Sequence, residues 1–127
     1  MIINDPATLA EVSAAFHRYE RALMDNDLAA LDGLFWDSPL TLRYGVGENL
    51  YGMEAIRRFR LQRLGGSPPR VLQATLITTY GTDAGTANTE FLRDGSRLIG
   101  RQSQTWIRLP EGWRIVAAHV SMMAAHS

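Results

Sequence analysis

The 127-residue chain contains no cysteine and only three histidines. The absence of cysteine excludes disulfide bonds, a thiolate nucleophile and zinc sites built on thiolates. His17, His119 and His126 are too few for a histidine-rich metal site. We therefore predict that the protein binds no metal ion.

Lysine is absent too, so all thirteen basic residues are arginines. Schiff-base chemistry through a lysine amine is thereby excluded. An anionic ligand would have to be bound by arginine, histidine, hydroxyl groups or backbone amides. An arginine in a mostly apolar cavity requires an anion, because its guanidinium group does not lose its charge.

Neither sign of charge is in excess, and no long apolar run is present. Thirteen basic residues balance thirteen acidic ones, which argues against binding to nucleic acid or to an anionic membrane surface. No segment approaches the roughly 20 apolar residues that span a bilayer. Residues 1–12 do not have the pattern of a secretory signal. We expect a cytoplasmic protein, and we expect residues 1–127 to form one domain.

Apolar residues recur at helical spacing in three segments of the first half of the chain. Asp5 and Pro6 predict the start of the first helix, and Asp27 predicts the start of the second. The predicted helices cover residues 6–23, 28–34 and 53–64.

Residues 35–44 are typical of a strand, and glycines in 45–52 indicate a loop or hairpin. The second half predicts four strands separated by turns of hairpin length, over residues 70–80, 85–93, 97–109 and 113–122. Helices followed by an antiparallel meander predict an α+β fold, with the helices packed on one face of the sheet. If the sheet is strongly curved around the first helix, it forms a cone with a pocket at the open end.

Two residues are the first candidates for that pocket. Tyr19 lies on the apolar stripe of the first helix, so its hydroxyl group either reaches the rim of the core or donates into the pocket. Arg43 alternates with Leu40 and Leu42 along its strand, so it is either solvated or directed into the pocket. Glu20 is expected in solvent, because it points about 100° away from Tyr19 on the helix.

For other charged side chains, the sequence leaves open whether they face the pocket or lie at the surface. Arg60 and Arg101 either face the same cavity or form surface ion pairs. Arg63 is expected to point mostly outward from the third helix. Glu48 lies in the glycine-bounded loop, where it either closes the site or pairs with Arg43.

The run Gly-Arg-Gln-Ser-Gln-Thr-Trp at 100–106 is polar on both faces of its strand, as expected at a sheet edge, a wet cavity or an interface. Ser103 lies on one of these faces. His119 is in phase with Trp113 and Ile115 in the last strand. We expect His119 on their face, either as a satisfied core residue or as an acid or base in the pocket.

The other face of the 100–106 run predicts an interface between chains. Gln102, Gln104 and Trp106 share that face, which an open sheet would leave exposed. An exposed face that combines aromatic and polar groups favours the pairing of two sheets. We therefore expect a homodimer.

The order of elements and the closing hairpin resemble the SnoaL-like, nuclear-transport-factor-2-like superfamily. The resemblance covers nearly the whole chain, including Leu42-Arg43-Tyr44 and the pair of runs 101–106 and 112–121. The closing hairpin is also similar to the association domain of calcium/calmodulin-dependent kinase II. The resemblance implies the cone fold, which hosts isomerases, dehydratases, cyclases and oligomerisation domains.

A narrower set of motifs resembles the AtzH-like/HpxZ family. These motifs are Phe35-Trp36-x-x-Pro39, Arg43-x-Gly45-x-x-Glu48-x-Leu50-x-Gly52, Ile56-x-x-Phe59-Arg60 and the run at 100–106. HpxZ members are associated with oxalurate breakdown, and the AtzH type is a decarboxylating amidohydrolase that converts 1,3-dicarboxyurea to allophanate. The catalytic tyrosine and arginine of that type correspond to Tyr19 and Arg43. The candidate substrate-binding residues are Trp36, Glu48, Arg60, Arg101, Ser103 and His119.

The resemblance implies an enzyme that acts on a small anionic ureido-carboxylate and needs no cofactor. Arg43 would bind one carboxylate, and Tyr19 would donate a proton or a hydrogen bond. Two alternatives stay open. In the first, the chain would be a non-catalytic carboxylate-binding protein or amidase partner of the same pathway. In the second, it would be an isomerase or dehydratase with His119 as the base.

Overall fold

The helices begin where their capping residues predict. In the computed structural model, which describes residues 1–63 and 65–125, the Asp5 carboxylate accepts a hydrogen bond from the Thr8 backbone N–H at 3.1 Å. Asp27 caps the second helix in the same manner. The third helix follows Gly52, whose φ of 86° lies in the left-handed region that favours glycine. The three helices are α1 (Pro6–Met24), α2 (Leu28–Gly33) and α3 (Met53–Gln62).

The strands form one sheet in the order β2-β1-β6-β5-β4-β3. Neighbouring strands are antiparallel, except that β1 runs parallel to β6. The strands are β1 (Leu42–Tyr44), β2 (Asn49–Tyr51), β3 (Arg70–Tyr80), β4 (Ala84–Arg93), β5 (Leu98–Leu109) and β6 (Gly112–Ala124). The predicted α+β fold, with three helices and a mainly antiparallel sheet, is confirmed.

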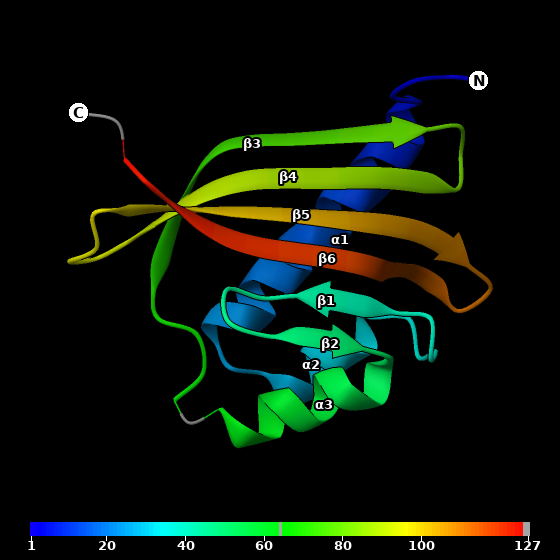
Figure 1. Ribbon diagram of the computed structural model, residues 1–127. Coiled ribbons are helices and arrows are strands. Elements are labelled where there is room, and N and C mark those ends of the chain that lie inside the picture. Colours follow the sequence, from blue (N-terminus) through cyan, green and yellow to red (C-terminus); the bar gives the residue numbers. More distant parts are fainter. Residues whose placement is uncertain (64, 126–127) are drawn as a thin grey trace.

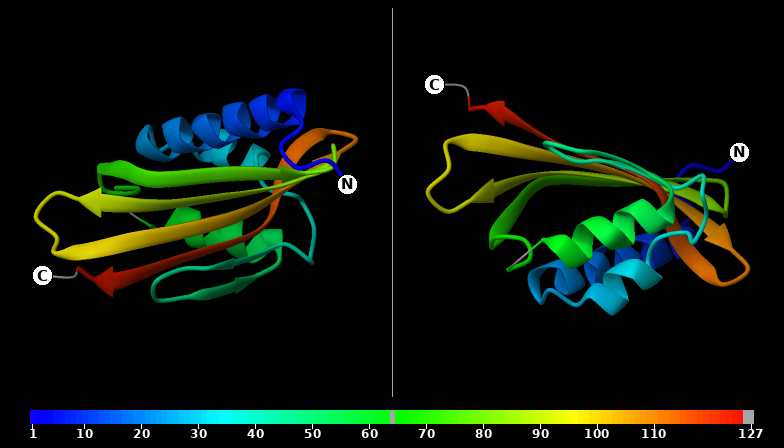
Figure 2. Two further views of the ribbon diagram at one scale, coloured as in Figure 1. Left: turned by 90° about the horizontal axis from the view of Figure 1, so that it is seen from above. Right: turned by 60° about the horizontal axis from the view of Figure 1, so that its bottom comes forward.

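All three helices lie on one side of the sheet, and the other side is uncovered (Figure 2). α1 runs diagonally behind the long strands, whereas α2 and α3 lie near the short β1–β2 hairpin (Figure 1). No helix in the described part of the chain is long and apolar enough to cross a membrane. The core between α1 and the sheet is built on Phe16, Phe35, Trp106 and Ile115, which are almost fully buried.

The segment before the third helix differs from the prediction. Only the end of the predicted strand at 35–44 joins the sheet as β1, and Phe35 makes a single bridge to Ile115. The glycine-bounded loop folds back as a hairpin and adds β2 at the sheet edge. This hairpin brings Arg43 of β1 close to Glu48 in the turn between β1 and β2.

A β-bulge reverses the face on which the second half of β6 presents its side chains. Thr105 pairs with Ala117. The next residue of β5, Trp106, pairs with Ile115, so one residue of β6 is extra. An extra residue shifts the alternation by one position. His119 is therefore exposed on the uncovered face, and the prediction that it shares a face with Ile115 is wrong.

The polar run of β5 also faces the opposite way from the prediction. Gln102, Gln104 and Trp106 are at most 2% exposed, because their face lies beneath the helices. The Trp106 indole N–H donates to Gln104 Oε1 at 3.1 Å and Arg70 donates to Gln102 Oε1, whereas the Nε2 atoms of both glutamines are buried without a hydrogen-bond partner among the described residues. The uncovered face instead presents Arg101 and Ser103. The expectation that the glutamine and tryptophan face is exposed for dimerisation is therefore wrong.

Candidate active site

A small pocket lies between the C-terminal half of α1, the β1–β2 hairpin and α3. Its apolar walls are Leu23, Leu50, Ile56 and Phe59, and its polar side chains are Tyr19, Arg43, Arg60 and Arg63. The volume enclosed by these side chains is about 10 Å³, which is roughly the space of one water molecule. An organic ligand therefore requires at least one side chain at the pocket to move.

Tyr19 reaches the pocket from the apolar stripe of α1. The residue is 4% exposed, and its ring centre lies 6.2 Å from that of Phe35. Within residues 1–63 and 65–125, no hydrogen bond to the Tyr19 hydroxyl is found. Because a buried phenol normally has a hydrogen-bond partner, this hydroxyl is available to a ligand.

Arg43 enters the pocket from β1 and is paired with a carboxylate of its own hairpin. Its Nη1 lies 3.1 Å from Oε1 of Glu48, and the two side chains are 14% and 26% exposed. The backbone N–H of Gly47 donates to the other carboxylate oxygen at 3.2 Å. The Arg43 guanidinium also lies 5.8 Å from the centre of the Phe59 ring. Glu48 thus occupies the position that an anionic ligand of Arg43 would need.

Gly45 allows this arrangement because it has no side chain. A Cβ at position 45 would lie 1.8 Å from Oε1 of Glu48 and 3.1 Å from Nη1 of Arg43. The same glycine donates its backbone N–H to the Glu48 carbonyl at 2.9 Å, which closes the hairpin. Any other residue at 45 would push the carboxylate away from Arg43.

Arg60 lines the pocket, but its charge is already compensated. The side chain is 6% exposed, its Nη1 lies 2.5 Å from Oδ1 of Asp32, and its guanidinium stacks 4.6 Å from the centre of the Phe35 ring. This partly buried pair connects α3 with α2. Arg60 thus adds to the positive potential of the pocket without offering an unpaired charge.

Arg63 was expected to point outward, and the structure instead places it in the pocket. The reason is that α3 ends at Gln62 and Arg63 has extended backbone angles, φ −83° and ψ 109°. Its side chain therefore leaves the helical phase on which the prediction depended. Its Nε is buried without a hydrogen-bond partner among the described residues. Burial, and then the charge of Arg43, lower the pKa of the Arg63 guanidinium below its usual value.

Three of the predicted substrate-binding residues lie outside the pocket. Arg101, Ser103 and His119 are on the uncovered face of the sheet, whereas Arg43 faces the helices. Ser103 Oγ lies 2.6 Å from Oδ1 of Asn88, and the His119 ring packs edge-on against Tyr44 at 5.6 Å. Within one chain, these residues do not meet a ligand that Arg43 binds.

Trp36 holds the backbone together instead of lining the pocket. The backbone N–H of Trp36 donates to the Ile115 carbonyl at 2.9 Å, and the Trp36 carbonyl accepts a hydrogen bond from the Thr41 hydroxyl at 2.7 Å. These bonds attach the segment after α2 to β6 and to the approach to β1. Its half-buried side chain is not among the residues that enclose the pocket.

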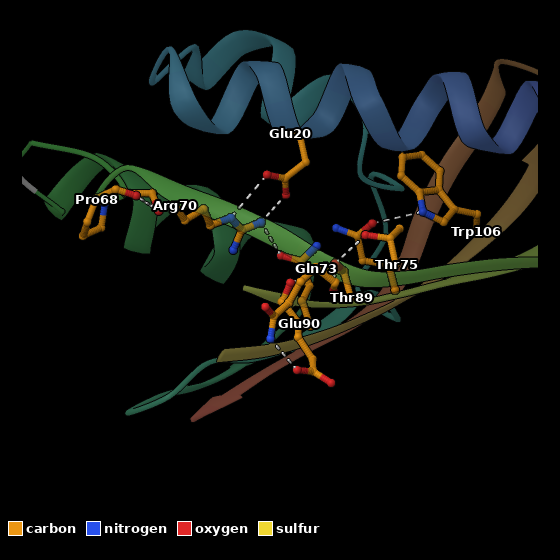
Figure 3. Close-up of polar contacts among 11 residues, drawn as sticks. Glu20, Pro68, Arg70, Gln73, Thr75, Thr89, Glu90 and Trp106 are labelled. Atoms are coloured by element: carbon orange, nitrogen blue, oxygen red, sulfur yellow. Dashed lines mark hydrogen bonds and ion pairs between the residues drawn. The ribbon is translucent and has the colours of Figure 1, made fainter. Parts of the chain in front are cut away.

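Glu20 is part of a buried ion pair, and the expectation that it is solvated is wrong. It reaches from α1 to Arg70 on β3 (Figure 3), and the two side chains are 12% and 2% exposed. Arg70 also donates to Gln102 Oε1 at 2.9 Å and stacks over the Phe91 ring at 4.4 Å. The helical wheel could not show this contact, because it depends on the tertiary packing of β3 against α1.

The described residues also form depressions that are more open to solvent than this pocket. A larger depression of about 560 Å³ is open to solvent at the start of α3, where Arg57 is paired with Asp37 at 2.8 Å. Within residues 1–63 and 65–125, no group of three or more histidine or acidic side chains is placed to hold a metal ion.

The cone of three helices on a curved sheet, with a polar pocket between helices and sheet, defines a protein of the nuclear transport factor 2 (NTF2)-like or cystatin-like class. Solved structures agree with this class. A Salmonella enterica NTF2-like superfamily protein is 27% identical, with a TM-score of 0.75 over 95% of this chain and 94% of that one. Comparison with protein families matches residues 1–126 to the AtzH-like family. The chain belongs to the AtzH-like family.

Two solved structures are similar over nearly the whole chain. A protein of unknown function from the DUF3225 family of Pectobacterium atrosepticum is 60% identical, with a TM-score of 0.94 over 96% of this chain and 95% of that one. A cystatin-like fold protein from Burkholderia xenovorans is 50% identical, with a TM-score of 0.96 over 99% of both chains. A search of curated proteins finds no match.

Proposed function

We propose that the protein is a cofactor-independent enzyme that acts on a short carboxylated urea of the 1,3-dicarboxyurea or oxalurate type, by decarboxylation or amide hydrolysis, in cytoplasmic nitrogen catabolism. The observation that supports the proposal is the convergence of the Tyr19 hydroxyl and the Arg43 guanidinium on one pocket. The membership of the AtzH-like family supports the same reaction type.

The chemistry requires a proton donor and an anion clamp. Arg43 binds a carboxylate of the substrate through two N–H groups. In a substrate of the 1,3-dicarboxyurea type, the bond between the urea nitrogen and the departing carboxyl carbon breaks, its electron pair stays on nitrogen, and CO₂ leaves. Tyr19 donates its proton to that nitrogen and regains one from water, a step typically worth about 10²–10⁴-fold in rate. Oxalurate has no carboxylate on nitrogen, so water would instead cleave its amide bond to give urea and oxalate.

A thermal-shift panel tests the proposal. The ligands are oxalurate, allophanate, biuret, malonate and oxalate, each added to the wild type and to Arg43→Ala. A ligand at 100 times its Kd stabilises a protein by about 2.7 kcal/mol, which raises Tm by a few degrees for a domain of this size. We expect ureido-carboxylates to raise Tm in the wild type and not in Arg43→Ala. No shift with any of them would contradict the proposal.

Turnover separates the enzyme from a binding protein. CO₂ release from a carboxylated urea, followed in the wild type and in Tyr19→Phe, should be lost in the variant while ligand binding persists. Binding without turnover in both proteins would instead indicate a carboxylate-binding protein or an amidase partner.

We also propose that a second copy of the chain covers the exposed face of the sheet. This face combines a polar patch around His119 with exposed apolar side chains on β3 and β4, where Val71 is 68%, Leu76 64% and Leu92 40% exposed. Such a mixture is typical of an isologous contact between two copies. Sedimentation velocity should show a dimer, and a monomer at micromolar concentration would contradict it.

A further inference from the structure

The pocket holds one more guanidinium than its neighbouring carboxylates can pair. Among the described residues, Arg60 is paired with Asp32 and Arg43 with Glu48, whereas Arg63 has no carboxylate partner. Arg63 and Arg43 also flank the same aromatic ring, 5.9 and 5.8 Å from the centre of Phe59.

The Arg63 side chain is partly buried, and its guanidinium Nε is buried without an acceptor among the described residues. It keeps its charge at all physiological pH values, and a buried donor without an acceptor is unfavourable. The acceptor that satisfies both conditions is an anionic oxygen. Arg60 does not share this requirement, because Asp32 and the Phe35 ring already surround it.

The carboxylate of Glu48 shows how a ligand would bind Arg43. Oε1 of Glu48 already accepts from Nη1 of Arg43, and only about 10 Å³ remains in the pocket. The residue is partly exposed on a hairpin with glycines at 45 and 47, so it can swing outward without disturbing the core. A carboxylate ligand binds Arg43 by taking the place of Glu48.

We infer that the pocket selects dicarboxylates, with one carboxylate replacing Glu48 on Arg43 and the other bound by Arg63. The inference rests on the proposed function and makes it more specific. It assigns Arg63 the role of a specificity-determining residue. A substrate with a single carboxylate would leave the Arg63 guanidinium without a partner and would bind more weakly.

Two probes with the same three-carbon backbone test the inference. Malonate carries two carboxylates, and monomethyl malonate carries one. Calorimetric titration at fixed ionic strength would measure both with the wild type, Arg63→Gln and Arg58→Gln. Arg58 is the matched control, because it lies on the same helix but is exposed and paired with Glu54.

We expect the wild type to bind malonate at least tenfold more tightly than its monomethyl ester. Arg63→Gln should weaken malonate binding at least tenfold and change ester binding less than twofold, whereas Arg58→Gln should change neither. If Arg63→Gln weakens the binding of malonate and of its ester equally, Arg63 contributes only a general positive potential. If binding of neither probe is weakened, Arg63 does not contact the ligand. Either result overturns the inference. If Arg63→Gln does not fold, as judged by circular dichroism, Arg63→Lys replaces it, with a smaller loss expected for malonate alone.

Glu48→Gln tests the exchange step separately. Loss of the competing carboxylate should tighten malonate binding about threefold or more, and weaker binding would contradict the exchange. Failure of the proposed function has a different signature. If the proposed function fails, either Arg43→Ala binds malonate as tightly as the wild type does, or the wild type binds no carboxylate. Both results are independent of the effect of Arg63→Gln.

Discussion

Arg43 and His119 belong to neighbouring strands and lie on opposite faces of the sheet. In the parallel register of β1 and β6, Arg43 pairs with Ala118, and the next pair is Tyr44 with His119. Arg43 consequently faces the helices, whereas His119 packs on the Tyr44 ring outside. The sheet therefore separates His119 from the Tyr19 hydroxyl within one chain.

Replacing His119 by asparagine should leave turnover within about twofold of the wild type, because the imidazole does not reach the pocket. Steady-state kinetics of CO₂ release from a carboxylated urea would measure this. Loss of activity in His119→Asn, with the oligomeric state unchanged, would favour an isomerase or dehydratase that uses this residue as its base.

Tyr19→Phe should lower kcat by about 10²–10⁴-fold, the usual contribution of a positioned proton donor. The fold should be unaffected, because no hydrogen bond to this hydroxyl is found among the described residues. Tyr51→Phe is the matched control, since Tyr51 is 64% exposed and its hydroxyl lies within hydrogen-bond distance of that of Tyr44. Equal kinetics of Tyr19→Phe and the wild type would contradict the assigned role.

Local signals in the sequence predicted most of the fold. The caps at Asp5 and Asp27, the helical spacing and the turn residues placed all three helices and the four long strands. For residues 45–52 the sequence left a loop and a hairpin open, and the hairpin with β2 is found, where pairing with β1 and packing on α3 stabilise it. Its position is a property of the tertiary structure.

The site was predicted in part, and the errors have physical causes. Tyr19 and Arg43 meet in one pocket with Glu48, Arg60 and Arg63. Arg63 could not be predicted, because its orientation depends on where α3 ends. His119 was assigned to the wrong face because a single extra residue in β6 reverses the alternation on which the assignment relied.

Breaking the buried pair between Glu20 and Arg70 should strongly destabilise the fold. Glu20→Gln leaves the charge of a 2% exposed arginine without a counter-ion, at a cost of about 3 kcal/mol. Glu54→Gln removes an exposed pair on α3 and should cost less than about 0.5 kcal/mol. Urea unfolding of both variants would measure the difference, and equal effects would contradict the importance of burial.

A methyl group at position 100 should be poorly tolerated. The Cβ of Gly100→Ala would lie 2.1 Å from the Phe91 ring, which is fully buried and stacked on Arg70. We expect a loss of about 1–3 kcal/mol from overpacking. The Cβ of Gly33→Ala, at the end of α2, would have no atom within 4 Å, so this substitution should raise the free energy of unfolding by about 0.5 kcal/mol. Denaturant unfolding would show the two changes with opposite sign.

The cap of α1 should depend on pH. Hydrogen bonds from the Thr8 hydroxyl and backbone N–H lower the pKa of Asp5 below 3.8. A carboxyl group with a lowered folded-state pKa stabilises the fold above its unfolded-state pKa, and this contribution is lost as the pH falls through the folded-state value. Asp5→Ala should therefore have a lower Tm than the wild type at pH 7, and the difference should shrink towards pH 3. A constant difference over this range would contradict the prediction.

The parallel pairing of β1 with β6 also determines when the pocket can form during folding. β1 and its hairpin partner β2 join the rest of the sheet through β6, the last strand in the chain. Arg43 is thus fixed in place by its pairing with Ala118 of β6. The chain between these two residues forms a long loop, and closing a long loop is entropically costly and slow. The helical hairpin and the β3–β5 meander can form from nearer contacts. The wall that carries Arg43 and Glu48 is therefore completed only after β6 has docked, which makes anion binding a late consequence of folding.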